Sequence, residues 1–170
     1  MNVKDLIDFG SELRLLLDPL FEHFTNGTTP SAGEASKQAN ALEKITKALS
    51  EAQRSTSFSR ADAIGALYEA KWVLEDSLDL AQHTPFSFSQ TRSRAMKRKI
   101  EQLDRHIAQA RELQALNAIA TVLTNADLAK FKAEVAAAQQ AVEARQDAQK
   151  TINTLVDVAV VAGKIAMKLI

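Results

Sequence analysis

The sequence predicts an all-α protein: an antiparallel helical bundle of about five helices that ends in a long C-terminal helical hairpin. Three observations support this fold class. Between Phe86 and Ile170 there is no proline and a single glycine, Gly163, so almost nothing there interrupts a helix. Four side-chain acceptors are each followed three residues later by an acid, which is the pattern of a helix start. Apolar residues recur at steps of three and four, which is typical of amphipathic helices.

The composition is that of one folded domain covering residues 1–170. Its 46% hydrophobic and 25% charged residues are typical of proteins with a buried core rather than of disordered chains. The absence of cysteine excludes disulfides, thiolate nucleophiles and zinc–thiolate sites. Lys4 is followed by Asp5 and Asp8, and no apolar signal-peptide core is present. We therefore expect a cytoplasmic protein, although a protein exported by a signal-independent route would show the same features.

Helix starts are marked by capping side chains. In each pair the first residue can accept a hydrogen bond from the amide of the third helical residue, and the acid lies at the positive end of the helix dipole. The pairs are Asn2 with Asp5, Ser31 with Glu34, Ser59 with Asp62, and Thr124 with Asp127. A fifth start at Ser89 follows the segment Pro85–Phe88. These starts predict helices at about 3–24, 31–53, 59–83, 89–122 and 124–170.

The first three predicted helices differ in their apolar content. The first has a continuous apolar face, but Pro19 should kink it or end it early. The second has few large apolar residues, so it should cover one edge of the bundle. The third contains the only tryptophan, Trp72, together with several leucines. We expect this third helix to be the central one.

The last two predicted helices carry regular apolar seams, and they should pair as a hairpin of residues 89–122 and 124–170. In the fourth helix, steps of four and three join Met96, Ile100, Leu103, Ile107 and Ala110. In the fifth, the seam is interrupted by Arg145 and Gln149. At about 1.5 Å per residue an unbroken fifth helix would span about 70 Å. It therefore either breaks in the polar stretch 145–150, leaving a separately packed helix at 151–170, or it protrudes and finds a partner.

Charge divides the chain into complementary halves. Residues 1–85 contain 8 basic and 13 acidic residues, a net charge of −5, whereas residues 86–170 contain 13 and 8, a net charge of +5. The strongest feature is the basic run Arg92, Arg94, Lys97, Arg98 and Lys99, close to the start of the fourth helix, where cations oppose the helix dipole. Either the acids of the third helix neutralise this run, or an external anion does.

The C-terminal twenty residues form a second candidate contact surface, because they are apolar on most sides of a helix. Such a helix is typical of a bundle core or a subunit interface, and a membrane contact is the alternative. Its uncharged stretch, Val158–Gly163, is too short to span a bilayer. The candidate partner or membrane contacts are Ile152, Leu155, Val156, Val160, Ile165, Leu169 and Ile170, with Phe86 and Phe88 before the fourth helix.

Sequence motifs for catalysis, metals or cofactors were sought among the spacings that such chemistry requires. The three histidines lack the Glu-x-x-His pairing of helical di-metal sites. No glycine-rich phosphate loop, nucleophile elbow or His-Glu-x-x-His sequence occurs. We therefore predict no enzyme activity, no catalytic or metal site, no cofactor and no small-molecule substrate.

Three functions remain open from the sequence. The first is a non-enzymatic helical interaction protein, such as an adaptor, an inhibitor or an immunity-type binder, which acts on a protein partner through a helix face and could self-associate. The second is a membrane-active protein, pore-forming or peripheral, that uses the apolar C-terminal helix. The third is nucleic-acid binding through residues 92–99, which the neutral net charge disfavours.

Overall fold

The protein is all-α in the computed structural model, which describes residues 9–52, 60–114, 125–145 and 147–167. Every regular element in these ranges is a helix. The helices are α2 (Phe9–Asn26), α3 (Ala32–Ala52), α4 (Arg60–His83), α5 (Gln90–Gln114), α6 (Asn125–Glu143) and α7 (Ala148–Met167). The prediction of an all-α protein is therefore confirmed, and α3, α4, α5 and α6 each begin at the residue after a predicted cap.

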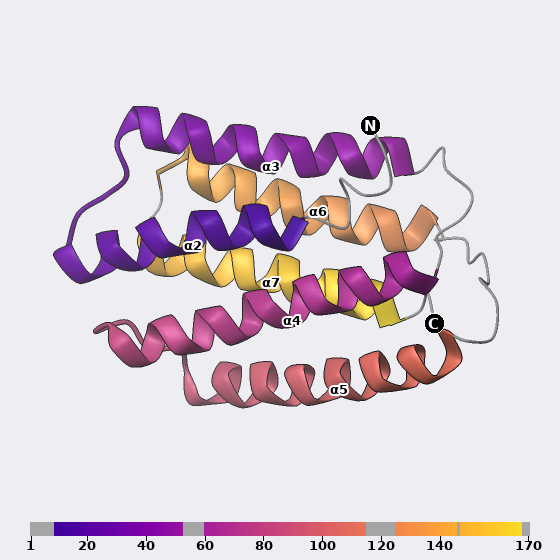
Figure 1. Cartoon of the computed structure of the whole chain (residues 1–170). Helices are drawn as coiled ribbons and strands as arrows, with labels where there is room; N and C mark the ends of the chain where they lie inside the picture. The colour runs from indigo at the N-terminus through magenta and orange to yellow at the C-terminus, as the bar shows by residue number, and fades with distance from the viewer. Residues whose placement is uncertain (1–8, 53–59, 115–124, 146, 168–170) are drawn as a thin grey trace.

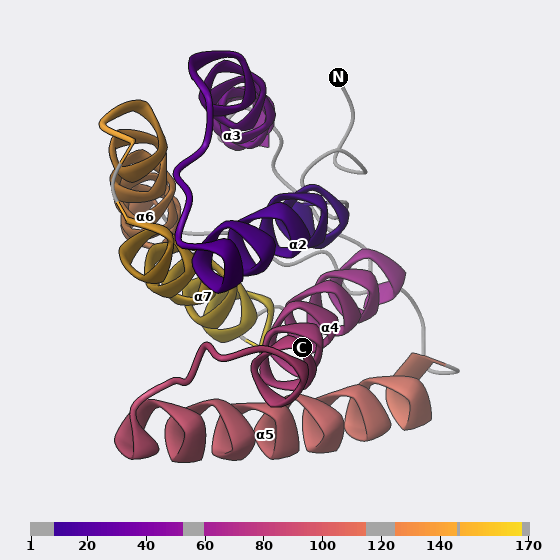
Figure 2. The same cartoon turned by 90° about the vertical axis from the view of Figure 1, so that its left-hand side faces the viewer.

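The helices lie alongside one another, and successive helices run in opposite directions (Figure 1). α7 packs against α2, α4, α5 and α6, whereas α4 packs against α2, α5 and α7. α3 and α5 lie at opposite ends of the assembly, as Figure 2 shows. α4 is thus central, as predicted, but it shares that position with α7.

The predicted C-terminal hairpin differs from the observed arrangement. Residues 124–170 form two helices, α6 and α7, and among the described residues α5 packs on α4 and α7 but not on α6. α6 packs instead on α3 and α7. The difference arises because the chain reverses after α6, so the apolar α7 folds back between α4 and α6.

The reversal occurs in the polar stretch that interrupts the predicted seam. Arg145 has a left-handed backbone with φ of 50°, and its amide donates to the Val142 carbonyl at 3.0 Å, which ends α6. Its Nε also donates to the Pro30 carbonyl at 2.9 Å. The Lys150 amide then donates to Asp147 Oδ1 at 2.9 Å, so Asp147 caps α7. Of the two alternatives for the overlong helix, the break is confirmed.

Two of the predicted caps are present with their expected geometry. Ser31 and Glu34 form a reciprocal capping box: the Ser31 amide donates to Glu34 Oε2 at 2.7 Å, and the Glu34 amide donates to Ser31 Oγ at 3.2 Å. Ser89 Oγ accepts from the Arg92 amide at 3.2 Å. The capping side chains Asn2, Ser59 and Thr124 lie outside the described residues.

Pro19 does not end the first helix, because α2 continues to Asn26. A proline leaves the carbonyl four residues earlier without its helical partner. That carbonyl belongs to Leu15, a residue that is 72% exposed, so solvent can satisfy it. α2 ends instead at Gly27, whose φ of 62° suits a glycine.

The core follows the predicted seams. In α5, the side chains of Met96, Leu103, Ile107 and Ala110 are buried, and in α6 those of Phe131, Val135, Ala138 and Val142. An aromatic cluster joins the start of α5 to α2: the Phe86 ring lies 4.9 Å from Phe21, 5.0 Å from Phe24 and 4.8 Å from Phe88 between centroids. These edge-to-face contacts fix the loop that precedes α5.

Candidate binding groove between α5 and α7

The apolar residues proposed as partner or membrane contacts are largely core residues. Ile152, Leu155 and Val156 are fully buried, Ile165 is nearly so, and Val160 is partly exposed. Leu169 and Ile170 lie outside the described residues. This burial follows from the position of α7, which is covered by four other helices. None of the described helices is long and apolar enough to cross a membrane.

Phe86 and Phe88 are buried as well, with 1% and 8% of their surface exposed. Both rings belong to the aromatic cluster that ties the loop before α5 to α2. They therefore hold the bundle together in this conformation instead of presenting an apolar surface.

The basic run, in contrast, lies on an edge helix. α5 packs only on α4 and α7 in the described part of the chain, which leaves its outer face open. Arg94, Lys97 and Arg98 are exposed, while Arg92 and Lys99 are partly buried toward α7. Within the described ranges, no carboxylate lies within ion-pair distance of the three exposed cations.

Acids of α4 do not neutralise this run, although that was one of the two expectations. Two of these acids pair elsewhere: Asp76 Oδ2 lies 3.7 Å from Arg14 Nε, and Glu75 Oε1 lies 3.5 Å from Lys71 Nζ. In the close ion pair between α4 and α5, α4 provides the cation and α5 the acid: Lys71 Nζ lies 2.6 Å from Asp104 Oδ1. Among the described residues, the exposed cations of α5 therefore form no ion pair with an acid of α4.

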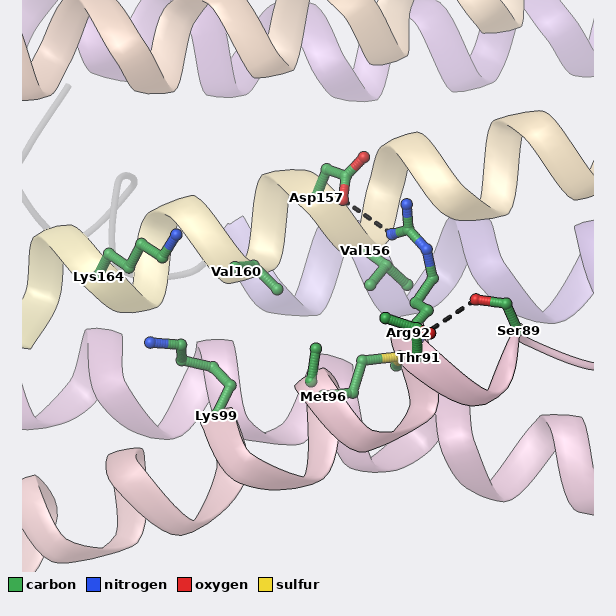
Figure 3. Close-up of a pocket in the computed structure, with 10 residues that line it drawn as sticks. Ser89, Thr91, Arg92, Met96, Lys99, Val156, Asp157, Val160 and Lys164 are labelled. Atoms are coloured by element: carbon green, nitrogen blue, oxygen red, sulfur yellow. Dashed lines mark hydrogen bonds and ion pairs between the residues drawn. The ribbon is translucent and has the colours of Figure 1, made fainter.

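A groove of about 460 Å³ runs between the first half of α5 and the second half of α7 (Figure 3). Its middle is apolar, with Met96 of α5 facing Val156 and Val160 of α7. The full lining is Ser89, Thr91, Arg92, Ala95, Met96, Lys99, Val156, Asp157, Val160 and Lys164. A shallow site of this size with an apolar middle and charged ends is suited to hold an amphipathic ligand.

At one end of the groove, an ion pair neutralises the charge of Arg92. Arg92 Nη1 lies 2.8 Å from Asp157 Oδ1 and donates to it. The same nitrogen is 3.5 Å from the Asn153 carbonyl, so two groups of α7 accept from it. Arg92 was predicted as part of a binding surface, but its charge is already matched within the protein.

The other end has two cations that face each other. Lys99 of α5 and Lys164 of α7 lie on opposite sides of the gap between the helices (Figure 3). Burial lowers the pKa of the Lys99 ammonium below its ordinary value, and the positive charge of Lys164 lowers it further. Lys99 Nζ donates to Gln102 Oε1 at 2.6 Å, which is a neutral partner. The only acid that lines the groove, Asp157, is engaged by Arg92.

The arrangement can bind a ligand, but it does not bring together the groups of an acid–base or nucleophilic mechanism. Its polar side chains are cations, one paired acid and two hydroxyls, and none of them is set beside a base that could activate it. Among the described residues no group of three or more His, Asp or Glu side chains is placed to hold a metal ion.

Two residues of the predicted basic run, Arg92 and Lys99, line the α5 side of the groove. The charged residues on the α7 side were not predicted as part of a site. In the sequence, Asp157 and Lys164 are the charges on either side of the uncharged stretch Val158–Gly163. They are seven residues apart, a spacing that places them on one helix face, and Val160 lies between them on that face. This spacing was the available signal that the two charges share a surface.

No protein family, no curated protein and no solved structure matches this chain. The features of the molecule that bear on its function are therefore the groove, with its cationic end and apolar middle, and the exposed cations of α5 beside it.

Proposed function

We propose that this protein is a non-enzymatic helical-bundle interaction protein that binds an acidic segment of a protein partner along α5 and the adjoining groove. The observation that carries the proposal is the state of α5: Arg94, Lys97 and Arg98 are exposed beside an apolar groove, with no carboxylate paired to them in the described part of the chain. An adaptor, an inhibitor or an immunity-type binder would each use such a face.

Charge complementarity favours an acidic partner. Arg94 lies three and four residues before Lys97 and Arg98, so these like charges repel one another on one face of α5, and an anion bound there relieves that repulsion. Long-range attraction would also speed encounter with an acidic segment. The partner's charges would meet the exposed residues of α5, while its apolar side chains would cover Val160, which is partly exposed.

A protein segment suits this surface better than nucleic acid or membrane. The chain is neutral overall, whereas nucleic-acid binders usually have a strong basic excess. α5 has no phenylalanine, tyrosine or tryptophan on which a base could stack. The apolar residues of α7 that would enter a membrane are in the core. The apolar middle of the groove is the feature that a protein helix can match.

Binding of a labelled acidic helical peptide tests the proposal. The probe is an alanine-based helix with leucine and glutamate four residues apart, and its control has glutamine in place of glutamate. Replacing Arg94→Glu and Arg98→Glu together should weaken binding of the glutamate peptide about tenfold, because two attractive charges become repulsive. Affinity should fall as salt is raised. Fluorescence anisotropy measures both effects.

A matched control separates the face of α5 from overall charge. Lys37→Glu with Lys130→Glu makes the same change in net charge on α3 and α6, where both lysines are exposed. This control should change affinity about twofold or less, since these charges are remote and screened. Equal losses in both variants would overturn the proposal, as would tighter binding of an RNA oligonucleotide than of the acidic peptide.

A further inference from the structure

The lysine end of the groove has two cations and, among the described residues, no anion paired with them. Lys99 and Lys164 come from different helices and approach the same end of the groove, and the pKa of Lys99 is lowered both by burial and by Lys164. In the described part of the chain neither ammonium group is paired with an acid, so their mutual repulsion destabilises the fold slightly. A single carboxylate placed between them would reverse that interaction.

The opposite end cannot compete for this carboxylate. Arg92 is 2.8 Å from Asp157 Oδ1, so its charge is already compensated. Arg92 and Lys99 are seven residues apart, which separates the two ends by about 10 Å along α5. The uncompensated positive charge is therefore confined to one end, and this asymmetry gives a bound ligand one preferred direction.

The apolar middle lies one helical turn from the lysines. Val160 precedes Lys164 by four residues on α7, and Met96 precedes Lys99 by three on α5, so in each helix the two side chains share a face. A ligand that fills both parts needs an apolar group and a carboxylate about one helical turn apart. On a helix this is an apolar residue and an acid three or four positions apart.

We propose that Lys99 and Lys164 together bind one aspartate or glutamate carboxylate of a partner helix, and that an apolar residue three or four positions from this acid docks against the partly exposed Val160. This inference rests on the proposed function and specifies what the groove recognises. The exposed cations of α5 attract acidic segments in general, whereas the lysine pair and the apolar middle select the spacing.

A double-mutant cycle between groove and peptide tests the pairing. Lys99→Gln and Lys164→Gln should each weaken binding of the leucine–glutamate peptide about fivefold. Both should leave the leucine–glutamine peptide almost unchanged, since the interaction requires the carboxylate. Lys130→Gln on α6 is the matched control and should affect neither peptide. Thermal unfolding monitored by circular dichroism verifies that each variant is folded.

A second pair of peptides tests the spacing. A peptide whose leucine and glutamate are two positions apart places the two side chains on different faces of its helix, so it should bind about as weakly as the glutamine peptide. Equal affinity for both spacings would overturn the selection proposed for the groove.

The outcomes separate this inference from the proposed function. If the lysine variants bind the glutamate peptide normally while Arg94→Glu with Arg98→Glu still weakens it, the lysine pair is not the acid site and the inference fails alone. If no acidic peptide binds, the proposed function fails with it. If vesicles of anionic lipid bind the protein, if this binding is lost in Lys99→Gln and Lys164→Gln, and if no peptide binds, the ligand is a lipid surface and the inference is overturned.

Discussion

Replacing Gly10 with alanine should destabilise the protein, because α4 lies too close to α2 at this residue to leave room for a side chain. A Cβ atom at Gly10 would lie 2.8 Å from the Glu69 carbonyl oxygen and 2.8 Å from the Glu69 Cβ. Real Cβ atoms do not tolerate such distances, and neither neighbouring atom is the end of a flexible side chain. The two helices would have to move apart, which would also strain the hydrogen bond of 3.3 Å from Ser11 Oγ to Glu69 Oε2.

Two effects of opposite sign set the magnitude. Alanine is favoured over glycine within a helix by up to about 1 kcal/mol. Overpacking a tight contact costs about 1 to 3 kcal/mol. The net loss should be about 1 to 2 kcal/mol, which lowers Tm by about 2 to 8 °C for a protein of this size. Urea unfolding and calorimetry of the purified variant measure these quantities.

Gly163→Ala is the matched control, because it makes the same substitution inside α7. There a Cβ atom would lie 3.2 Å from Leu103 Cδ2 and 3.3 Å from Ala70 Cβ, so its neighbours need move only slightly. The gain in helix propensity should roughly offset that adjustment, leaving stability within about 1 kcal/mol of the original. If Gly10→Ala is as stable as the unmodified protein, α2 and α4 are not packed as described.

Other substitutions test the groove and the caps. Lys99→Gln should raise stability at neutral pH: the folded-state pKa of Lys99 is lowered, so its charged form opposes folding, and this penalty disappears as the pH rises through that pKa. Tm measured across neutral and alkaline pH would contradict this if the variant were less stable throughout. Ser31→Ala should cost about 1 kcal/mol by removing the cap of α3, as measured by urea unfolding. A double-mutant cycle with Arg92→Ala and Asp157→Ala should give a coupling of about 0.2 to 1 kcal/mol, since both side chains are partly exposed; no coupling would mean that the ion pair does not form in solution.

Local signals in the sequence predicted the helices well because their causes are local. The capping box at Ser31 and the cap at Ser89 depend on residues only three apart, and the α5 seam depends on helical periodicity. The break after α6 was less clear. Asp147 caps α7, but no acid follows it three residues later, so the cap was not recognised and the stretch was seen only as a polar interruption.

The neighbours of each helix could not be predicted in the same way, since they depend on residues far apart in the chain. Arg92 and Asp157 are 65 positions apart, and nothing near either residue indicates the other. The charge division between the halves suggested that acids of α4 neutralise the basic run of α5. Instead, Asp76 pairs with Arg14 and Glu75 pairs with Lys71. Which face of α5 meets α7 depends on packing across the whole bundle.

Burial of α7 changes how its two charges should be understood. A helix that is apolar on most sides gains most by being surrounded, and in this fold its apolar residues form the core. Asp157 and Lys164 cannot share that environment without a large desolvation cost, so they must lie where α7 meets solvent. That place is the groove beside α5. The same requirement that keeps these charges out of the core gives the groove one neutralised end and one cationic end, which is the asymmetry that a ligand can recognise.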